Sequence, residues 1–538
     1  MVPHARYGNV RIHADAPTSR LRLSGDVPWR GRTLPCGLAP VRCTSNGKTD
    51  VTVSGTRGPR VAIIGCGLGG IAAAVKLKKK GLDFTVFEQS EGPGGTWWDN
   101  RYPGCEVDIA SHAYSFSFLT YDWTRTHAGQ EELQRYAEHV LDRFDVRRHC
   151  RFGVRVESAT WDEETARYEV RLADGTAEPF EVVISCLGLL SRPRYPDWRG
   201  LDRFEGPKFH TARWEHEHDL TGKRVAVVGT GSTASQVVPA IAGKVGQLYV
   251  FQRQPGWVLP KGERDFTARE RAIFRRLPFV QKIRRLFMFW KFRMVFKGYN
   301  PRGRMQRKIL RLCHEYLEKT VEDPKLRAQL TPDYPWACKR PVLSTGFYPA
   351  LNRPNVELVP HAVTRVTPNG IVDATGVEHD IDVLIMATGF ETTKFLASLD
   401  VRGTGGVSIH DTWKDDPRAF LGITVPGYPN FFMLYGPNTN GGFSVIAQLE
   451  RQAEVAARTV AEMRRKRFRA VDTRPSATDR WVRWVDGQIG KNTSSSDGGC
   501  TNYYHAESGR NVTQWPKPHG EYYLLTKALP FFGFIKVR

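Results

Sequence analysis

The sequence predicts an α/β fold built around two nucleotide-binding domains. The chain has 538 residues and a hydrophobic fraction of 41%, which is enough for two or three globular domains with buried cores. A short apolar run, a glycine-rich turn and an apolar helix follow one another twice, with first glycines at Gly65 and Gly229. A near-repeat of this kind is typical of two Rossmann-like dinucleotide-binding domains in one chain.

The first turn lies in "RVAIIGCGLGG", directly after an apolar run suited to a buried parallel strand. Gly65 allows the tight turn, Gly67 lets the backbone approach a pyrophosphate, and Gly70 lets helix and strand pack closely. The pyrophosphate then meets the partially positive start of the helix. Glu88 follows the next strand, where a carboxylate can hold ribose hydroxyls. Strand, turn, helix, strand and terminal acid together indicate a bound dinucleotide.

The second turn lies in "RVAVVGTGSTAS" and contains Gly229, Gly231 and Ser232. The strand after it ends at Arg253 rather than at an acid. A cation at this place favours a 2′-phosphate, which indicates NADPH rather than NADH. Two such domains suggest one tightly held and one exchanging cofactor, and FAD with NADPH is the pair that allows hydride transfer to a flavin.

Composition shifts divide the chain. Residues 1–56 are rich in Arg, Pro, Gly and Ser and show no apolar period, so we expect a disordered basic extension. The first part of the FAD-binding domain is expected at 57–205, the NADP-binding domain at 206–384, and the second part of the FAD-binding domain with C-terminal loops at 385–538. A helical insertion is expected at 262–330.

That insertion is basic and aromatic. The stretch "FVQKIRRLFMFWKFRMVF" carries too many charges to span a membrane. An inserted helical subdomain is the favoured interpretation. The alternative is a pair of membrane-surface helices, with Phe289, Trp290 and Phe292 entering the lipid.

The formal net charge is +22. We interpret it as a largely solvated surface charge rather than as the mark of a nucleic-acid partner, because no nucleic-acid-binding motif is present. Nine cysteines are scattered without paired metal spacing, which argues against a zinc site and against a disulfide scaffold. A reducing, cytoplasmic location is the expectation that follows.

A second group of candidate residues lies in "GGTWWDNRYPGCEVD", soon after Glu88. Gly95 permits close backbone approach, Trp97 offers a flat surface beside a flavin or substrate, and the Pro-Gly pair favours a turn that would place Asp108. We also expect Thr96 and Tyr114 to bind cofactor. The alternative is an aromatic corner of the core.

This segment resembles a signature of the flavin-dependent Baeyer–Villiger monooxygenases. The stretch "FEGPKFHTARW" resembles their other fingerprint, matching at Phe204, Gly206, His210 and Trp214, with Glu215 where relatives usually carry Pro or Asp. The resemblance covers residues 60–534. It implies that this stretch joins the two nucleotide domains and moves with cofactor binding. His210 would organise it through hydrogen bonds rather than act as a general base, and Trp214 would anchor packing.

The resemblance also assigns roles within "WACKRPVLSTGFY". Arg340 matches the family's catalytic arginine, and Lys339 matches a residue that contacts the 2′-phosphate. A permanently charged guanidinium can stabilise a peroxide anion and its adduct without losing its proton. Asp108 would pair with Arg340. Gln254 replaces the Thr or Ser that relatives often carry beside the 2′-phosphate, which puts strict NADPH preference in doubt.

The implied reaction is the conversion of a ketone to an ester or lactone by NADPH and O2 through a peroxyflavin. Residues 434–442 form a turn rich in Asn and Gly beside an apolar run, which could approach the flavin or the substrate. Residues 498–511 resemble the family's mobile loop over the nicotinamide, with Tyr503 and Tyr504 shielding that ring. Ordinary surface loops are the alternative for both stretches. A related flavin monooxygenase that oxygenates nitrogen or sulfur, and a membrane-surface redox sensor, remain alternatives. The sequence does not identify the ketone.

Overall fold

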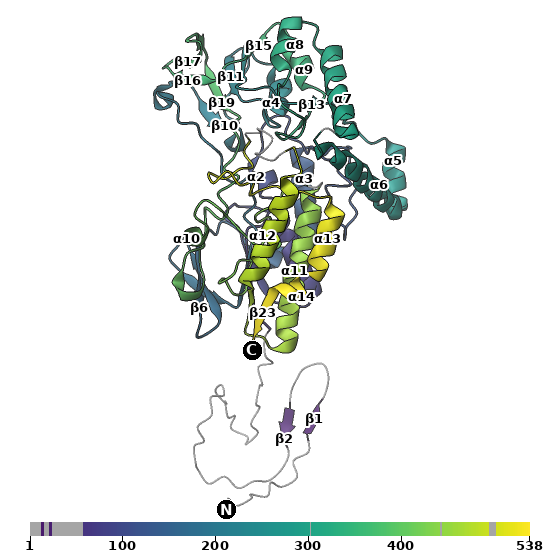
Figure 1. Ribbon diagram of the computed structural model, residues 1–538, viewed down its shortest axis with the longest axis vertical. Helices are drawn as coiled ribbons and strands as arrows, with labels where there is room; N and C mark the ends of the chain where they lie inside the picture. Colours follow the sequence, from purple (N-terminus) through teal and green to yellow (C-terminus); the bar gives the residue numbers. More distant parts are fainter. Residues whose placement is uncertain (1–11, 15–20, 24–57, 302, 442–443, 494–501) are drawn as a thin grey trace, which may run out of the picture. The chain divides into compact units, whose positions relative to one another are not determined.

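The computed structural model describes residues 12–14, 21–23, 58–301, 303–441, 444–493 and 502–538. The chain divides into two compact units, Met1–Gly58 and Pro59–Arg538. In the first unit, β1 (Ile12–Ala14) pairs antiparallel with β2 (Leu21–Leu23). Apart from these two strands, residues 1–56, for which disorder was predicted, lie outside the described residues. All further elements belong to the second unit (Figure 1).

The first large sheet has five parallel strands in the order β21-β9-β3-β4-β5. Strands β3 and β9 at its centre are buried along their whole length, as expected when helices cover both faces of a parallel sheet. Helix α1 (Leu68–Lys79) follows β3 and packs against α11 (Val445–Lys466). The strands are β3 (Val61–Ile64), β4 (Phe84–Phe87), β5 (Cys150–Arg151), β9 (Val182–Ser185) and β21 (Phe431–Met433).

The second large sheet is also five-stranded and parallel, in the order β10-β19-β11-β12-β15. Helices α4 (Ala234–Ile241) and α9 (Phe347–Leu351) contact each other beside it. The two sheets confirm the predicted α/β class with two Rossmann-like halves. The strands are β10 (Lys208–His210), β11 (Arg224–Val228), β12 (Gln247–Phe251), β15 (Val356–Val359) and β19 (Val383–Met386).

Smaller elements extend each half. One four-stranded sheet joins β6 (Val156–Asp162), β7 (Arg167–Leu172), β8 (Ala177–Phe180) and β20 (Asp400–Arg402). A three-stranded antiparallel sheet joins β16 (Val363–Val366), β17 (Gly370–Asp373) and β18 (Glu378–Asp380). Strands β13 (Val258–Leu259) and β14 (Val342–Leu343) pair in parallel on either side of the insertion. Short helices α2 (Thr96–Asp99) and α10 (Ile409–Trp413) and the longer α3 (Gln130–Arg143) complete the set.

The insertion predicted at 262–330 is helical. It consists of α5 (Ala268–Arg276), α6 (Pro278–Phe296), α7 (Arg304–Thr320) and α8 (Pro324–Leu330). In Figure 1, α7 and α8 lie near the second sheet, whereas α5 and α6 lie lower, at the level of α3. A search of the described residues finds no helix with the length and apolarity needed to cross a membrane.

The C-terminal part is more helical than the sequence indicated. Besides α11 it contains α12 (Pro475–Ile489), α13 (His519–Ala528) and α14 (Pro530–Gly533), where only C-terminal loops were predicted. Strand β22 (Ala470–Thr473) pairs with the last strand, β23 (Phe534–Val537). Cys338 takes part in a disulfide, whereas the other cysteines that the structure describes are free thiols.

Candidate functional site

One large cavity, of about 1760 Å³, is lined by both glycine turns. Its size exceeds the usual range for a single drug-sized ligand and suits two extended cofactors with a substrate. Gly70 and the four fingerprint residues lie outside its lining. The predicted site residues that line it are Gly65, Gly67, Glu88, Gly95, Thr96, Trp97, Asp108, Tyr114, Gly229, Gly231, Ser232, Arg253, Lys339 and Arg340.

Two glycines of the first turn, Gly65 and Gly70, leave no room for a side chain. Gly65 has φ +100°, and a Cβ there would lie 2.9 Å from the carbonyl oxygen of Cys186. A Cβ at Gly70 would lie 1.9 Å from the carbonyl oxygen of Gly65, so helix and turn contact each other through backbone alone. Gly67 caps α1 without any side-chain hydrogen bond. The first amides of α1 therefore face the cavity as donors suited to a pyrophosphate.

Glu88 lies at the end of β4, 6% exposed, and lines the cavity. Its carboxylate accepts hydrogen bonds from the backbone amides of Cys66 at 2.6 Å and Ser90 at 2.9 Å. These contacts fix the carboxylate at the rim of the turn, where it can also accept from a ribose.

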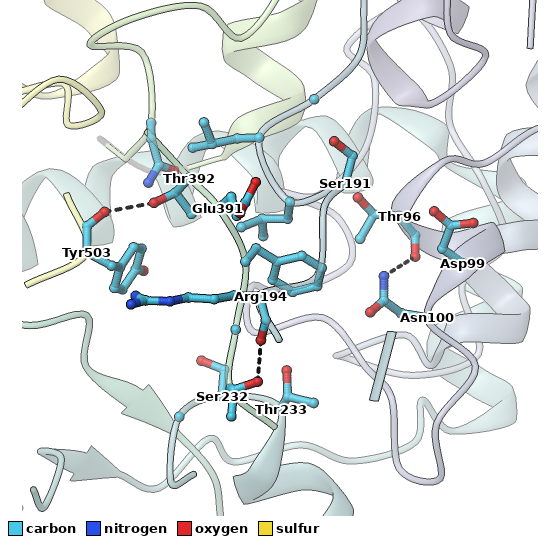
Figure 2. A pocket seen from close by; sticks show the side chains of 18 of the residues that line it. Thr96, Asp99, Asn100, Ser191, Arg194, Ser232, Thr233, Glu391, Thr392 and Tyr503 are labelled. Carbon is cyan, nitrogen blue, oxygen red and sulfur yellow. Dashed lines mark hydrogen bonds between the residues drawn. The ribbon is translucent and has the colours of Figure 1, made fainter. Parts of the chain in front are cut away.

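The second turn repeats this geometry with more open space. Gly229 has φ +122°, and a Cβ there would lie 2.5 Å from the carbonyl oxygen of Ala387. Gly231 has nothing within 4 Å of such a Cβ, so space for a phosphate lies in front of it. Ser232 and Thr233 line the same part of the cavity, and Figure 2 shows both side chains there.

Two cations gather beyond this turn. Lys339 donates a hydrogen bond to the side-chain carbonyl of Gln254, and both line the cavity together with Arg253. Burial, and then the charge of Arg253, lower the pKa of Lys339. A phosphate bound between the two cations would relieve that repulsion, which is the expected behaviour of an anion site.

Arg340 and Asp108, which are 232 positions apart in the chain, form an ion pair inside the cavity. Nη2 of Arg340 lies 3.2 Å from Oδ2 of Asp108. The Asp108 side chain is 15% exposed, whereas that of Arg340 is 42% exposed and opens into the cavity. The carboxylate therefore holds one edge of the guanidinium while other donors stay free for a ligand.

A residue that the sequence analysis did not single out holds Asp108 in place. Nε2 of Gln236, on α4, donates to the carbonyl of Glu106 at 3.0 Å and to Oδ1 of Asp108 at 3.4 Å. Its Oε1 accepts from the hydroxyl of Tyr102 at 3.0 Å. A Cβ at Gly104, which has φ +78°, would lie 2.6 Å from the carbonyl oxygen of Gln236, so this close approach needs glycine. In the sequence, Gln236 and Ser235 are the polar residues of a mostly apolar helix, which does not by itself indicate a contact with Asp108.

Tyrosines surround the guanidinium. Burial alone would lower the pKa of Arg340, but the Asp108 carboxylate beside it raises that pKa, so the guanidinium stays charged. Burial raises the pKa of Tyr114 to about 12, and its hydroxyl accepts a hydrogen bond from Trp97 Nε1 at 3.1 Å. The Tyr114 phenol is therefore a neutral hydrogen-bonding group at ordinary pH. Tyr299 and Tyr435 also interact electrostatically with Arg340. Tyr435 lies in the predicted 434–442 stretch, whereas Tyr299 was not predicted.

The C-terminal loop contacts the arginine segment. Asn502 Nδ2 donates to the carbonyl of Cys338 at 2.7 Å, and Thr392 donates to the carbonyl of Tyr503 at 2.7 Å, as drawn in Figure 2. Tyr503 lines the cavity. Residues 498–501 and 442 of the two predicted loops lie outside the described residues.

The fingerprint stretch lies apart from the cavity lining. His210 ends β10, is fully buried, and its Nδ1 accepts from the amide of Ala212 at 3.1 Å. Burial lowers the pKa of His210 to about 4. Phe204 is buried in the core under the second sheet, and Trp214 packs edge-on against Phe209 at 5.1 Å between ring centroids. A Cβ at Gly206 would lie 2.3 Å from the carbonyl oxygen of Asp382.

Comparisons with known proteins agree with this geometry. A family model described as flavin-binding monooxygenase-like matches residues 58–283. A Baeyer–Villiger monooxygenase of Streptomyces coelicolor is 41% identical over 467 residues, covering 86% of this chain and 90% of the relative. A Baeyer–Villiger monooxygenase of Pseudomonas aeruginosa is 37% identical over 472 residues, covering 87% and 89%.

Solved structures give the same result. Cyclohexanone monooxygenase from Rhodococcus sp. Phi1 bound to NADP+ superposes with a TM-score of 0.79 at 32% identity, covering 89% of this chain and 99% of that one. OTEMO in complex with FAD and NADP superposes with a TM-score of 0.80 at 28% identity, with the same coverage. Sequence identity over most of both chains, together with the shared fold, shows that this chain belongs to the Baeyer–Villiger monooxygenase family.

Proposed function

We propose that this protein is an FAD- and NADPH-dependent monooxygenase that inserts one atom of O2 beside a ketone carbonyl, giving an ester or lactone. The observation that carries the proposal is the Arg340–Asp108 ion pair, at 3.2 Å, in a cavity bounded by two dinucleotide turns. The redox chemistry belongs to the cofactors: NADPH supplies a hydride, and the flavin uses those electrons to activate O2.

The residues of the first half fit FAD. The bare backbone at Gly65, Gly67 and Gly95 admits a pyrophosphate, since a Cβ at Gly95 would already lie 3.0 Å from the Cα of Gly67. Glu88 would hold the ribose, and Trp97 with Tyr114 would form a wall of the flavin end of the cavity. We assign Thr96 to the same site because it lines the cavity beside Gly95.

The residues of the second half fit NADPH. Gly229, Gly231 and Ser232 would hold the pyrophosphate at the start of α4. Arg253 and Lys339 would hold the 2′-phosphate, with Gln254 positioning the lysine. Two cations at this place support a preference for NADPH over NADH.

Arg340 would act on charge that develops on the substrate. When an oxygen nucleophile adds to a ketone, the carbonyl oxygen becomes an anion, and a fixed cation nearby lowers the barrier. Asp108 fixes the guanidinium from one side, and Gln236 fixes Asp108. A charged arginine can play this part at every ordinary pH because it does not lose its proton.

The fingerprint stretch would act at a distance. His210, buried and bonded to the backbone beside it, would set the course of the chain between the two halves and transmit cofactor binding. Its position outside the cavity lining argues against a general-base role. A cytoplasmic location stays a prediction from the cysteine distribution.

Product analysis tests the proposal. The purified protein, reconstituted with FAD, is incubated with NADPH, O2 and matched panels of cyclic ketones, linear ketones and thioethers. We expect ketone-dependent NADPH consumption and ester or lactone products. Sulfoxides with no ester from any ketone would contradict the proposal and favour the nitrogen- or sulfur-oxygenating alternative.

A further inference from the structure

Helix α6 carries a stripe of large apolar side chains that point away from the protein. Its members are Phe279, Ile283, Leu286, Phe287 and Trp290, with exposed fractions of 56%, 58%, 69%, 60% and 58%. Steps of three and four residues place all five on one face of the helix. Single exposed apolar residues are ordinary, but a contiguous face of this kind marks an interaction surface.

The opposite face of α6 is fixed to the rest of the protein. Gln281 is buried, and its Nε2 donates to the carbonyl of Phe274 at 3.1 Å. Arg285 donates to the backbone carbonyl of Ser115, and the Phe289 ring packs against His519 at 5.6 Å between centroids. The orientation of α6 is thereby set, and the apolar stripe stays on the outside.

Basic residues flank this stripe. At about 100° per residue, Lys282 and Arg293 fall on one edge of the apolar arc and Lys291 falls on the other. The sequence contains no Asp or Glu between residues 271 and 314. In α5, the helix before α6, Arg269, Arg275 and Arg276 are exposed as well. An apolar arc with cations at its edges is the pattern of a helix that lies in a membrane interface.

We propose that α6 is a docking surface for anionic phospholipid membranes. The apolar stripe would enter the boundary between headgroups and acyl chains, and Lys282, Lys291 and Arg293 would contact lipid phosphates. A second copy of this chain fits less well, because a symmetric contact through the stripe would bring like charges together with no acid nearby. The inference is independent of the proposed reaction and concerns where the enzyme meets apolar ketones.

Vesicle flotation tests it with the full-length holoenzyme. The probes are vesicles of phosphatidylcholine alone and vesicles with about 30% phosphatidylglycerol. We expect binding to the anionic vesicles, weakened by salt, and little binding to phosphatidylcholine alone. The triple variant Leu286→Gln, Phe287→Gln, Trp290→Gln should bind the anionic vesicles at least about tenfold more weakly, because three apolar side chains no longer leave water.

A charge variant and a matched control separate the electrostatic from the apolar contribution to vesicle binding. Lys282→Gln, Lys291→Gln, Arg293→Gln should lose binding and most of its salt dependence. Arg135→Gln, Arg148→Gln, Arg465→Gln removes three exposed cations elsewhere and should bind within about twofold of the wild type. Flavin content and Tm of each variant confirm folding, since every substituted side chain is exposed.

Three results would overturn the inference. The first is wild-type protein that stays unbound to anionic vesicles at low salt. The second is an apolar triple variant that binds as well as the wild type. The third is a wild-type oligomer, seen by light scattering, whose mass falls in the apolar variant while no form binds vesicles; this result would assign the stripe to a copy of the same chain.

Discussion

Replacing Arg340 by Ala should separate cofactor reduction from oxygen insertion. A unit charge about 4 Å from a developing anion contributes ~4 kcal/mol at an effective dielectric constant of about 20 and ~1 kcal/mol in bulk water. The 42% exposure of the Arg340 side chain places the true value between these limits. A value near 2.7 kcal/mol corresponds to a loss of about 100-fold in ester formation, in line with the loss of one oxyanion-stabilising donor elsewhere.

The assay measures two rates in the same preparation. Anaerobic stopped-flow absorbance follows flavin reduction by NADPH, and chromatography follows ester formation under air. We expect the rate of flavin reduction to change by only a few-fold, whereas the amount of ester formed per NADPH consumed should fall sharply. Arg340→Lys should form ester at a rate between those of the wild type and Arg340→Ala. The positive charge remains in this variant, but the planar guanidinium that donates to Asp108 is lost. Arg203→Ala, an exposed arginine outside the cavity lining, is the control for loss of one charge. Arg340→Ala with ester formation within about threefold of the wild type would refute the reasoning.

Three further predictions follow from the site and its surroundings. Gln236→Leu should lower ester formation about tenfold with little change in KM for NADPH, because Asp108 loses its support; a change in KM alone would contradict this. Lys339→Ala should raise KM for NADPH about tenfold and leave KM for NADH unchanged, as steady-state kinetics with both coenzymes can show. Burial lowers the pKa of His112 from 6.5 to about 4, so the unfolded chain binds this proton first as the pH falls. The free energy of unfolding should therefore fall between about pH 6.5 and 4, by at most ~1.4 kcal/mol per pH unit from this group. His112→Phe, at a position between two phenylalanine rings, should flatten that slope in urea titrations, and an unchanged slope would show that His112 is not its source.

The two glycine turns could be predicted from local sequence. Gly65, Gly70 and Gly229 were predicted because a tight turn and close backbone packing depend on neighbouring residues only, and the structure shows the crowding that excludes a Cβ at each. Glu88 and Arg253 were likewise predictable, since the end of a strand after such a turn has a fixed place relative to the nucleotide.

The surroundings of Arg340 could not be predicted from local sequence, because they are formed by residues that lie far apart in the chain. In the sequence, Arg340 is one residue of an ordinary Lys-Arg pair, and only the resemblance to the family indicated its role. Gln236 and Tyr299 interact with Asp108 and Arg340 from two separate elements, and no motif marks either residue in the sequence. Helix α13 gave little local signal, because only Tyr522 and Thr526 in it are buried. Helix α12 was predictable, because Trp481, Val485 and Ile489 recur at helical spacing after Pro475 at its start.

Asp108 follows strands of one parallel sheet, whereas Arg340 and Gln236 belong to the half built on the other. The first sheet takes its strand β21 from the part of the chain that follows the second half. A cut before β10 would therefore separate Asp108 from Arg340 and also remove β21 from the first sheet, whereas a cut after β19 would keep the ion pair in one fragment but still break that sheet. The proposed oxygen insertion would thus require both halves in one continuous chain.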